Sequence, residues 1–150
     1  MVARPIVSFL EGEGTDARGR TVFDVLAMND VALEHTHDFI QWLFPLPEPS
    51  AAVPDAPVLS PEDIQAIRVS ELAPIALAGA TDRMAIFYQT THGWLMPNDH
   101  NHRRITRIIR SLRLLVGDAE ADAFRDAILD RVAETRAPVS ARSRGYWATA

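Results

Sequence analysis

The stretch DHNHRRITRIIRSLRLLV, residues 99–116, carries the clearest helical pattern in the chain. Its apolar residues recur at spacings of three and four, which places them on one stripe of a helix. The stripe consists of Ile105, Ile108, Ile109, Leu112, Leu115 and Val116. Gly117 follows and suits the C-terminal cap of this helix. Because such a stripe is stable only when other elements cover it, the stretch predicts a packed helical domain.

The remaining sequence predicts more helices and no strands. Thr21 and Asp24 suit a capping box for a short helix to about Met28, and Ser60 before Pro61 begins another that runs to about Val69. Further helices are expected over 31–44 and 70–93, and from Asp118 to the helix-breaking Pro138. Residues 45–57 hold five prolines and are expected to form an extended strap, followed at the far end by a tail over 140–150. The predicted fold class is all-α, a single-domain helical bundle of about five to seven helices over residues 1–150.

Composition excludes several classes of function. The 150 residues contain no cysteine, so disulfide frameworks and thiolate chemistry are absent. No run approaches the length of a membrane span, and the apolar run over 5–10 is too short for a signal peptide, so we expect a cytoplasmic protein with no membrane partner. All 15 basic residues are arginine, as is typical of a GC-rich genome, and the net charge of −5 argues against nucleic acid as a partner.

The stretch EHTHDFIQWLFP, residues 34–45, holds the first candidate site. On the predicted helix over 31–44, His37 shares the apolar face with Leu33, Ile40 and Phe44. A histidine in such a position is either a core residue that is fully hydrogen-bonded or an acid/base or ligand-orienting group. Asp38 lies about 100° around the helix, so another segment must supply the partner of His37.

That segment is expected to be NDHNHRRITR, residues 98–107. His100 and His102 crowd a predicted helix start, where unpaired backbone N–H groups favour an anion. Asn98 or Asp99 could instead be a simple helix cap. On the same helix Arg103, Arg107 and Arg110 form a basic face, which is either solvated or, with RSRGYW at residues 142–147, a nucleic-acid contact.

Metal and cofactor motifs are lacking. His35 and His37 are two residues apart and cannot share a helix face, and no ordered motif such as HExxH occurs. There is neither a nucleophile elbow nor a P-loop lysine. We therefore predict no metal site and no cofactor.

Four segments together resemble the conserved domain of the opioid growth factor receptor family. They are DARGRTVFDVLAMNDVALEHTHDFIQWLFPLPEPS, APVLSPEDI, RMAIFY and NDHNHRRITRIIRSLRLL, and the two most specific motifs within them are His37–Pro45 and Asn101–Leu112. The resemblance covers roughly residues 9–148, so the chain is similar to this domain standing alone. Animal members are described as receptors for an enkephalin peptide, whereas a lysine-free chain of this kind is typical of bacteria, where a hormone receptor is not expected.

The resemblance implies a polar site made by its two motifs. We expect a pocket between the helix over 31–44 and the helix over 99–116 that binds a small organic molecule or short peptide with an anionic group. The expected ligand-binding residues are His37, Asp38, Gln41, Trp42, Asn101, His102, Arg104 and Arg107. Two other hypotheses stay open: an enzyme of bacterial specialised metabolism that uses His37, His102 or Asp38 as acid/base, and a structural or protein-interaction module.

Overall fold

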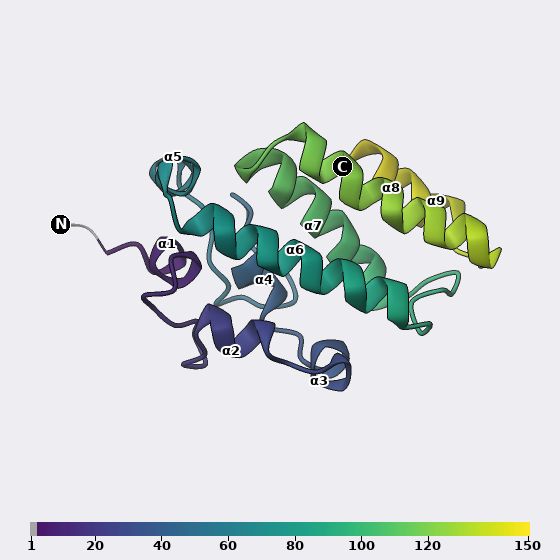
Figure 1. The fold of residues 1–150 in the computed structure, drawn as a ribbon, viewed down its shortest axis with the longest axis horizontal. Helices are drawn as coiled ribbons and strands as arrows, with labels where there is room; N and C mark the ends of the chain where they lie inside the picture. The colour runs from purple at the N-terminus through teal and green to yellow at the C-terminus, as the bar shows by residue number, and fades with distance from the viewer. Residues whose placement is uncertain (1–2) are drawn as a thin grey trace. The chain divides into compact units, whose positions relative to one another are not determined.

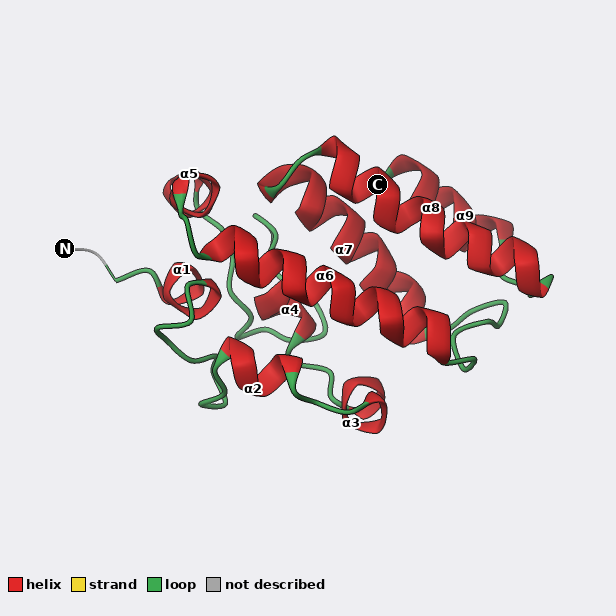
Figure 2. Cartoon of the chain, viewed as in Figure 1, coloured by secondary structure: helices red, strands yellow, loops and turns green. Residues whose placement is uncertain are grey.

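The computed structural model describes residues 3–150, and these residues form helices joined by loops (Figures 1 and 2). The described part contains one isolated bridge between Leu46 and Val58 and no longer strand. The helices are α1 (Pro5–Leu10), α2 (Val22–Leu26), α3 (Asp30–His35), α4 (Ile40–Leu43), α5 (Pro61–Val69), α6 (Ala73–Thr90), α7 (His100–Leu115), α8 (Asp118–Thr135) and α9 (Ala141–Thr149). The all-α prediction is confirmed. The expected number of five to seven helices is too low for the described residues. Helices α1 and α9 were not predicted, and α3 and α4 were predicted as one continuous helix.

Backbone contacts divide the chain into two compact units, one ending at Ala80 and the other comprising Thr81–Ala150. Helix α6 has residues in both. In the first unit α1 contacts α4 and α5. The core of this unit is formed by apolar side chains that are almost fully buried, including Phe9, Leu10, Val25, Leu33, Phe39, Leu43, Phe44 and Ile67.

The predicted caps in the first unit are confirmed. Thr21 accepts a hydrogen bond from the backbone N–H of Asp24, whose carboxylate accepts one from the backbone of Thr21. Ser60 and Asp63 form a second capping box at α5, and Asp63 also pairs with Arg4 at 3.0 Å. Burial raises the pKa of Asp63, but hydrogen bonds from Ser60 and Arg4 outweigh it and lower the pKa overall. The local capping signals therefore have the geometry expected from the sequence.

The predicted continuous helix over 31–44 is wrong. Helix α3 ends at His35, because Thr36 adopts an extended conformation with φ −97° and ψ 124°. The chain turns through 36–39 before α4, and the side-chain amide of Gln41 donates to the carbonyl of His37 within this turn. His37 is exposed, so it does not share the buried face of Leu33 and Ile40.

The proline-rich segment is not an extended strap. Leu46 bridges to Val58, and the backbone N–H of Leu59 donates to the carbonyl of Leu46 at 3.0 Å. The segment therefore doubles back and forms a closed loop between α4 and α5. The prolines account for the absence of helix in the loop. The pairing of its two ends was not predicted, because it joins residues far apart in the sequence.

In the second unit α7, α8 and α9 contact one another (Figure 1). The predicted stripe of α7 is buried except for Val116, which is 42% exposed. On α8 the buried residues are Ala121, Phe124, Ile128 and Val132. The predicted tail over 140–150 is wrong, because Ser140 caps α9 and Trp147 is completely buried. Gly145 and the small number of apolar residues in this segment gave no helical pattern in the sequence, because the helix is stabilised by tertiary packing.

Candidate functional site

A cavity of about 510 Å³ opens on the surface of the first unit. Its walls come from the end of α3 and the turn before α4, from the loop between α4 and α5, and from Arg18. The lining residues are Arg18, His35, Thr36, His37, Asp38, Ala52, Val53, Pro54 and Asp55. Two predicted site residues, His37 and Asp38, therefore lie together at one cavity wall.

A network of ion pairs fixes one side of this cavity. Arg20 joins Asp16 at 2.6 Å and Asp38 at 2.9 Å, and Arg18 contacts the other oxygen of Asp38 at 2.9 Å. Asp16 is buried and also accepts the backbone N–H groups of Arg18 and Arg20. Gly19 completes this tight loop with φ +79°, a conformation that side chains other than glycine rarely adopt. The loop thus presents both arginines to Asp38.

The network keeps Asp38 ionised. Burial raises the pKa of its carboxyl, but hydrogen bonds from Arg18 and Arg20 outweigh the burial and lower the pKa overall. Burial likewise lowers the pKa of Arg20, and its hydrogen bonds to Asp16 and Asp38 raise that pKa overall. Asp38 is therefore a carboxylate at neutral pH and is poorly suited to donate a proton there.

Arg18 combines a fixed position with free hydrogen-bonding capacity. Its side chain is 69% exposed, and its Nε donates to Asp38. Among the described residues its Nη1 and Nη2 groups have no acceptor, so four N–H bonds of the guanidinium remain for a ligand. His35 and Asp55 lie on the same cavity and are exposed.

Two other predicted residues of the first motif lie in the interior. Gln41 is buried, and its amide oxygen has no hydrogen-bond partner in the described chain, while its nitrogen supports the turn at His37. Trp42 is buried and packs edge-on against Phe9, with ring centroids 5.4 Å apart. Neither side chain lines the cavity.

The second motif forms a buried hydrogen-bond network in the second unit. His102 is buried, with Nδ1 2.8 Å from the hydroxyl of Ser143 and Nε2 2.8 Å from the carbonyl of Trp94. Since a carbonyl only accepts, Nε2 donates to Trp94, while a hydroxyl both donates and accepts, so Ser143 can pair with Nδ1. Trp147 packs edge-on against the ring and donates from Nε1 to the backbone carbonyl of His102. Both ring nitrogens of His102 are thus satisfied within the protein.

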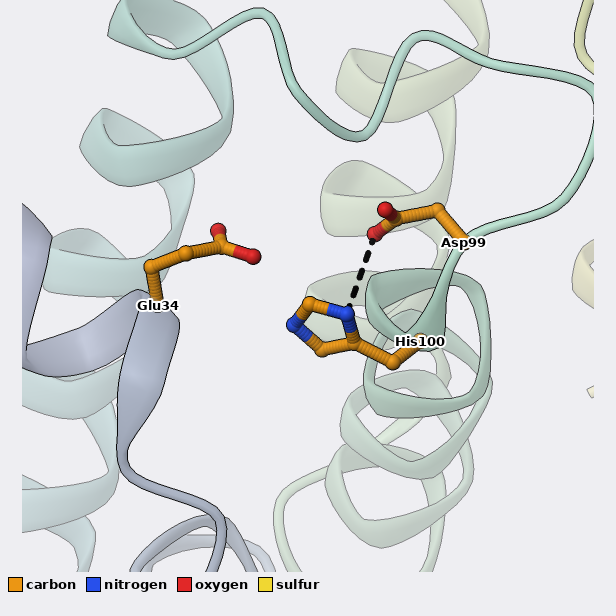
Figure 3. Close-up of side chains that lie close together, drawn as sticks. All are labelled: Glu34, Asp99 and His100. Atoms are coloured by element: carbon orange, nitrogen blue, oxygen red, sulfur yellow. Dashed lines mark ion pairs between the residues drawn. The ribbon is translucent and has the colours of Figure 1, made fainter.

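The start of α7 extends this network. Tyr88 donates to the amide oxygen of Asn101, which is completely buried, and Trp94 donates to the carbonyl of Tyr88. Asp99 caps the helix by accepting from the backbone and side chain of Asn101, and its carboxylate lies 3.7 Å from the ring of His100 (Figure 3). Of the two alternative caps, Asn98 and Asp99, it is Asp99 that caps α7, and its carboxylate accepts from N–H groups that an anion would need.

The remaining predicted residues on α7 differ in exposure. Arg104 is 6% exposed, whereas Arg107 is half-buried. The residues that the sequence analysis did not select are Arg18 and Asp55 at the cavity and Ser143 beside His102. The spacing of DARGR, residues 16–20, could have indicated the loop that carries Arg18. An aspartate two and four residues before arginines suits a tight loop with internal ion pairs.

The fold and the two polar clusters define a class of all-α domain, with short capped helices, a charged surface cavity and a buried histidine network. Residues 21–93 match the family described as "Opioid growth factor receptor (OGFr) conserved region". Residues 21–93 are therefore similar to that conserved region, and the matched stretch is slightly less than half of the chain. The match includes the cavity walls at residues 35–38 and 52–55 and ends before α7.

Two further comparisons return no relatives: no curated protein matches the chain, and no solved structure does. Within residues 3–150, the helices are each too short or too polar to cross a lipid bilayer.

Proposed function

We propose that the protein binds a small organic molecule or a short peptide through an anionic group, at the cavity of the first unit. One observation carries this proposal: the guanidinium of Arg18 stands at the cavity with two nitrogens that have no acceptor in the described chain. A planar guanidinium with a free edge suits bidentate binding of a carboxylate or phosphate. The cavity volume of about 510 Å³ suits a small ligand.

The other cavity residues support a ligand that also carries a positive group. Asp38 holds Arg18 in place and is itself neutralised by Arg18 and Arg20. Asp55 is exposed on a different segment of the cavity wall and has no ion-pair partner among the described residues. His35 and His37 add hydrogen-bonding ring nitrogens at the same cavity wall. An amino acid or short peptide, with an anionic and a cationic end, therefore suits these charges.

We assign a structural role to the second motif. Both ring nitrogens of His102 and the amide of Asn101 are engaged inside the second unit. A ligand that contacted these groups would have to displace bonds that are already made, at a cost of about 1–3 kcal/mol for each group left unsatisfied. Gln41 and Trp42 are also buried, Gln41 with its amide nitrogen donating to the carbonyl of His37 and Trp42 packed against Phe9, and neither lines the cavity.

The surroundings of the three acid/base candidates, Asp38, His102 and His37, favour binding over catalysis. Asp38 has a lowered pKa and two arginine partners, so it is a weak base and a poor acid near neutral pH. His102 is enclosed by Ser143, Trp94 and Trp147. Of the three candidates His37 is the one exposed at the cavity, where His35 is exposed as well, and two exposed histidines suit ligand contact.

A thermal-unfolding screen tests this proposal. Wild-type protein and Arg18→Gln are melted with amino acids, dipeptides, simple carboxylates and inorganic phosphate, each at high concentration. A ligand at 100 times its Kd stabilises the native state by about 2.7 kcal/mol. We expect at least one compound to raise the Tm of the wild type and to leave that of Arg18→Gln unchanged.

Arg68→Gln is the matched control, because Arg68 is exposed at the end of α5 in the same unit but away from the cavity lining. This variant should retain the full ligand shift. The proposal is overturned if no compound stabilises the wild type, or if Arg18→Gln responds as strongly as Arg68→Gln.

A further inference from the structure

The part of α6 that belongs to the first unit is apolar on its outer face as well as on its buried face. Residues 73–80, APIALAGA, contain no polar side chain. The buried face is formed by Ala73, Leu77 and Ala80. The exposed residues of the segment are Pro74, Ile75, Ala78 and Gly79. Because a surface helix usually carries polar residues on its outer face, this exposed face has the character of a contact surface.

One flank of this outer face continues onto α2. Leu72, Ile75 and Gly79 recur at spacings of three and four and therefore share one flank of α6. Ile75 is 69% exposed and Leu72 is 48% exposed. A Cβ atom at Gly79 would lie 3.6 Å from Cδ1 of Leu26, so the end of α2 packs against this flank. Phe23, one turn earlier on α2, is 66% exposed.

Contacts at the end of α1 connect the start of α2 to the start of α6. A Cβ atom at Gly12 would lie 3.0 Å from two ring carbons of Phe23. The preceding residue, Glu11, accepts a hydrogen bond of 2.7 Å from the hydroxyl of Ser70, which in turn accepts from the backbone N–H of Leu72. Helix α2 therefore runs along the first turns of α6 in the same direction. We call the resulting surface the α2–α6 patch, and its residues are Phe23, Leu26, Leu72, Ile75 and Gly79.

The charges around the α2–α6 patch are mainly negative. Residues 21–80 contain nine acidic residues and a single arginine, Arg68. Three exposed carboxylates directly adjoin the patch or its contact at Gly12 in the sequence: Glu13, Asp24 and Glu71. An apolar surface with a carboxylate border attracts a partner that combines apolar and cationic side chains, and it repels anionic lipid and nucleic acid.

We propose that the α2–α6 patch binds a basic amphipathic helix of a partner protein. The apolar face of such a helix covers the exposed side chains of Phe23 and Ile75, and its lysines or arginines meet the carboxylate border. A second copy of this chain is a poorer occupant, because it brings the same carboxylates to the same border. The patch lies outside the lining of the cavity, so the proposal is independent of ligand binding there.

The test is fluorescence anisotropy with the full chain and a labelled helical peptide of leucine and lysine, whose leucines recur at spacings of three and four. A second peptide carries glutamate in place of every lysine and should bind at least tenfold more weakly. Phe23→Ser and Ile75→Ser should each weaken binding of the leucine–lysine peptide at least fivefold, because each removes an exposed apolar contact. Glu13→Gln/Glu71→Gln should weaken binding and reduce its dependence on salt.

Val116→Ser is the matched control, because Val116 is an exposed apolar residue of the second unit. It should change binding less than twofold, with circular dichroism used to verify that every variant is folded. The proposal is overturned if the leucine–lysine peptide does not bind, if the glutamate peptide binds equally well, or if Val116→Ser weakens binding as much as Ile75→Ser. Analytical ultracentrifugation adds one more outcome: a wild-type dimer that Ile75→Ser abolishes would assign the patch to a second copy and overturn the proposal.

Discussion

His102 illustrates how a histidine can belong to a specific motif and still be a structural residue. Its two ring nitrogens bond to Ser143 and Trp94, and its backbone carbonyl accepts from Trp147. One side chain therefore joins α7, α9 and the loop after α6 within the second unit. Sequence spacing placed His102 at a helix start but gave no information about Ser143, which is 41 residues away.

Replacing His102 by alanine should destabilise the protein by about 2–4 kcal/mol, because it leaves a cavity and removes the hydrogen bonds of the ring to the carbonyl of Trp94 and to the hydroxyl of Ser143. The free energy of unfolding in urea measures this loss. His92→Ala is the control: His92 is exposed in the same unit, and its loss should cost less than about 0.5 kcal/mol. A cost below 1 kcal/mol for His102→Ala would contradict the structural role.

Asp38 gives a prediction about pH. Its pKa is lowered in the folded protein, so its ion pairs stabilise the native state fully above the unfolded pKa of about 4 and are lost as pH falls through the folded value. Asp38→Asn should therefore cost a constant amount, about 1–2 kcal/mol given the exposure of Arg18, at pH 5–8.

The difference in unfolding free energy between wild type and Asp38→Asn should shrink as pH falls below about 4. Urea unfolding at closely spaced pH values between 3 and 7 measures it. A difference that stays constant down to pH 3 would show that the ion pairs with Arg18 and Arg20 do not stabilise the fold.

Among the helices, features that depend on residues close in the sequence could be predicted, whereas features that depend on contacts between distant segments could not. The caps at Thr21, Ser60 and Asp99 and the apolar stripe of α7 depend on residues within a few positions, and all were predictable. The break at Thr36 was not predicted, and the ion pairs of Asp38 just after it are made with Arg18 and Arg20, 20 and 18 residues away in the sequence. Helix α1 also escaped prediction, since its single turn and a half is stabilised by packing against α4 and α5.

Helix α9 provides the prediction at this scale. Trp147→Ala should cost about 3–5 kcal/mol, because the indole is completely buried and contacts His102 and Trp94. Tyr146→Ala, one position along the same helix, removes a half-exposed ring and should cost less than about 1 kcal/mol. Thermal unfolding of both variants makes the comparison, and similar losses would mean that α9 is a loosely attached tail.

For the whole molecule, the two polar sequence motifs have two different roles. The first motif contributes His37 and Asp38 to a charged cavity in one unit, and the second contributes Asn101 and His102 to a hydrogen-bond network in the other. The sequence identified the chemistry of both motifs but could not assign these tasks. The solvent exposure of these side chains decides the task of each motif, and this exposure depends on how the surrounding turns pack in the fold.

The most direct test of this division is a comparison of two variants in one assay. Calorimetric titration with the compound that most stabilises the wild type should give normal affinity for His102→Gln, measured below its lowered Tm, and at least tenfold weaker binding for Arg18→Gln at nearly unchanged stability. The opposite pattern, in which His102→Gln loses affinity while Arg18→Gln binds normally, would contradict the account and move the ligand to the second motif.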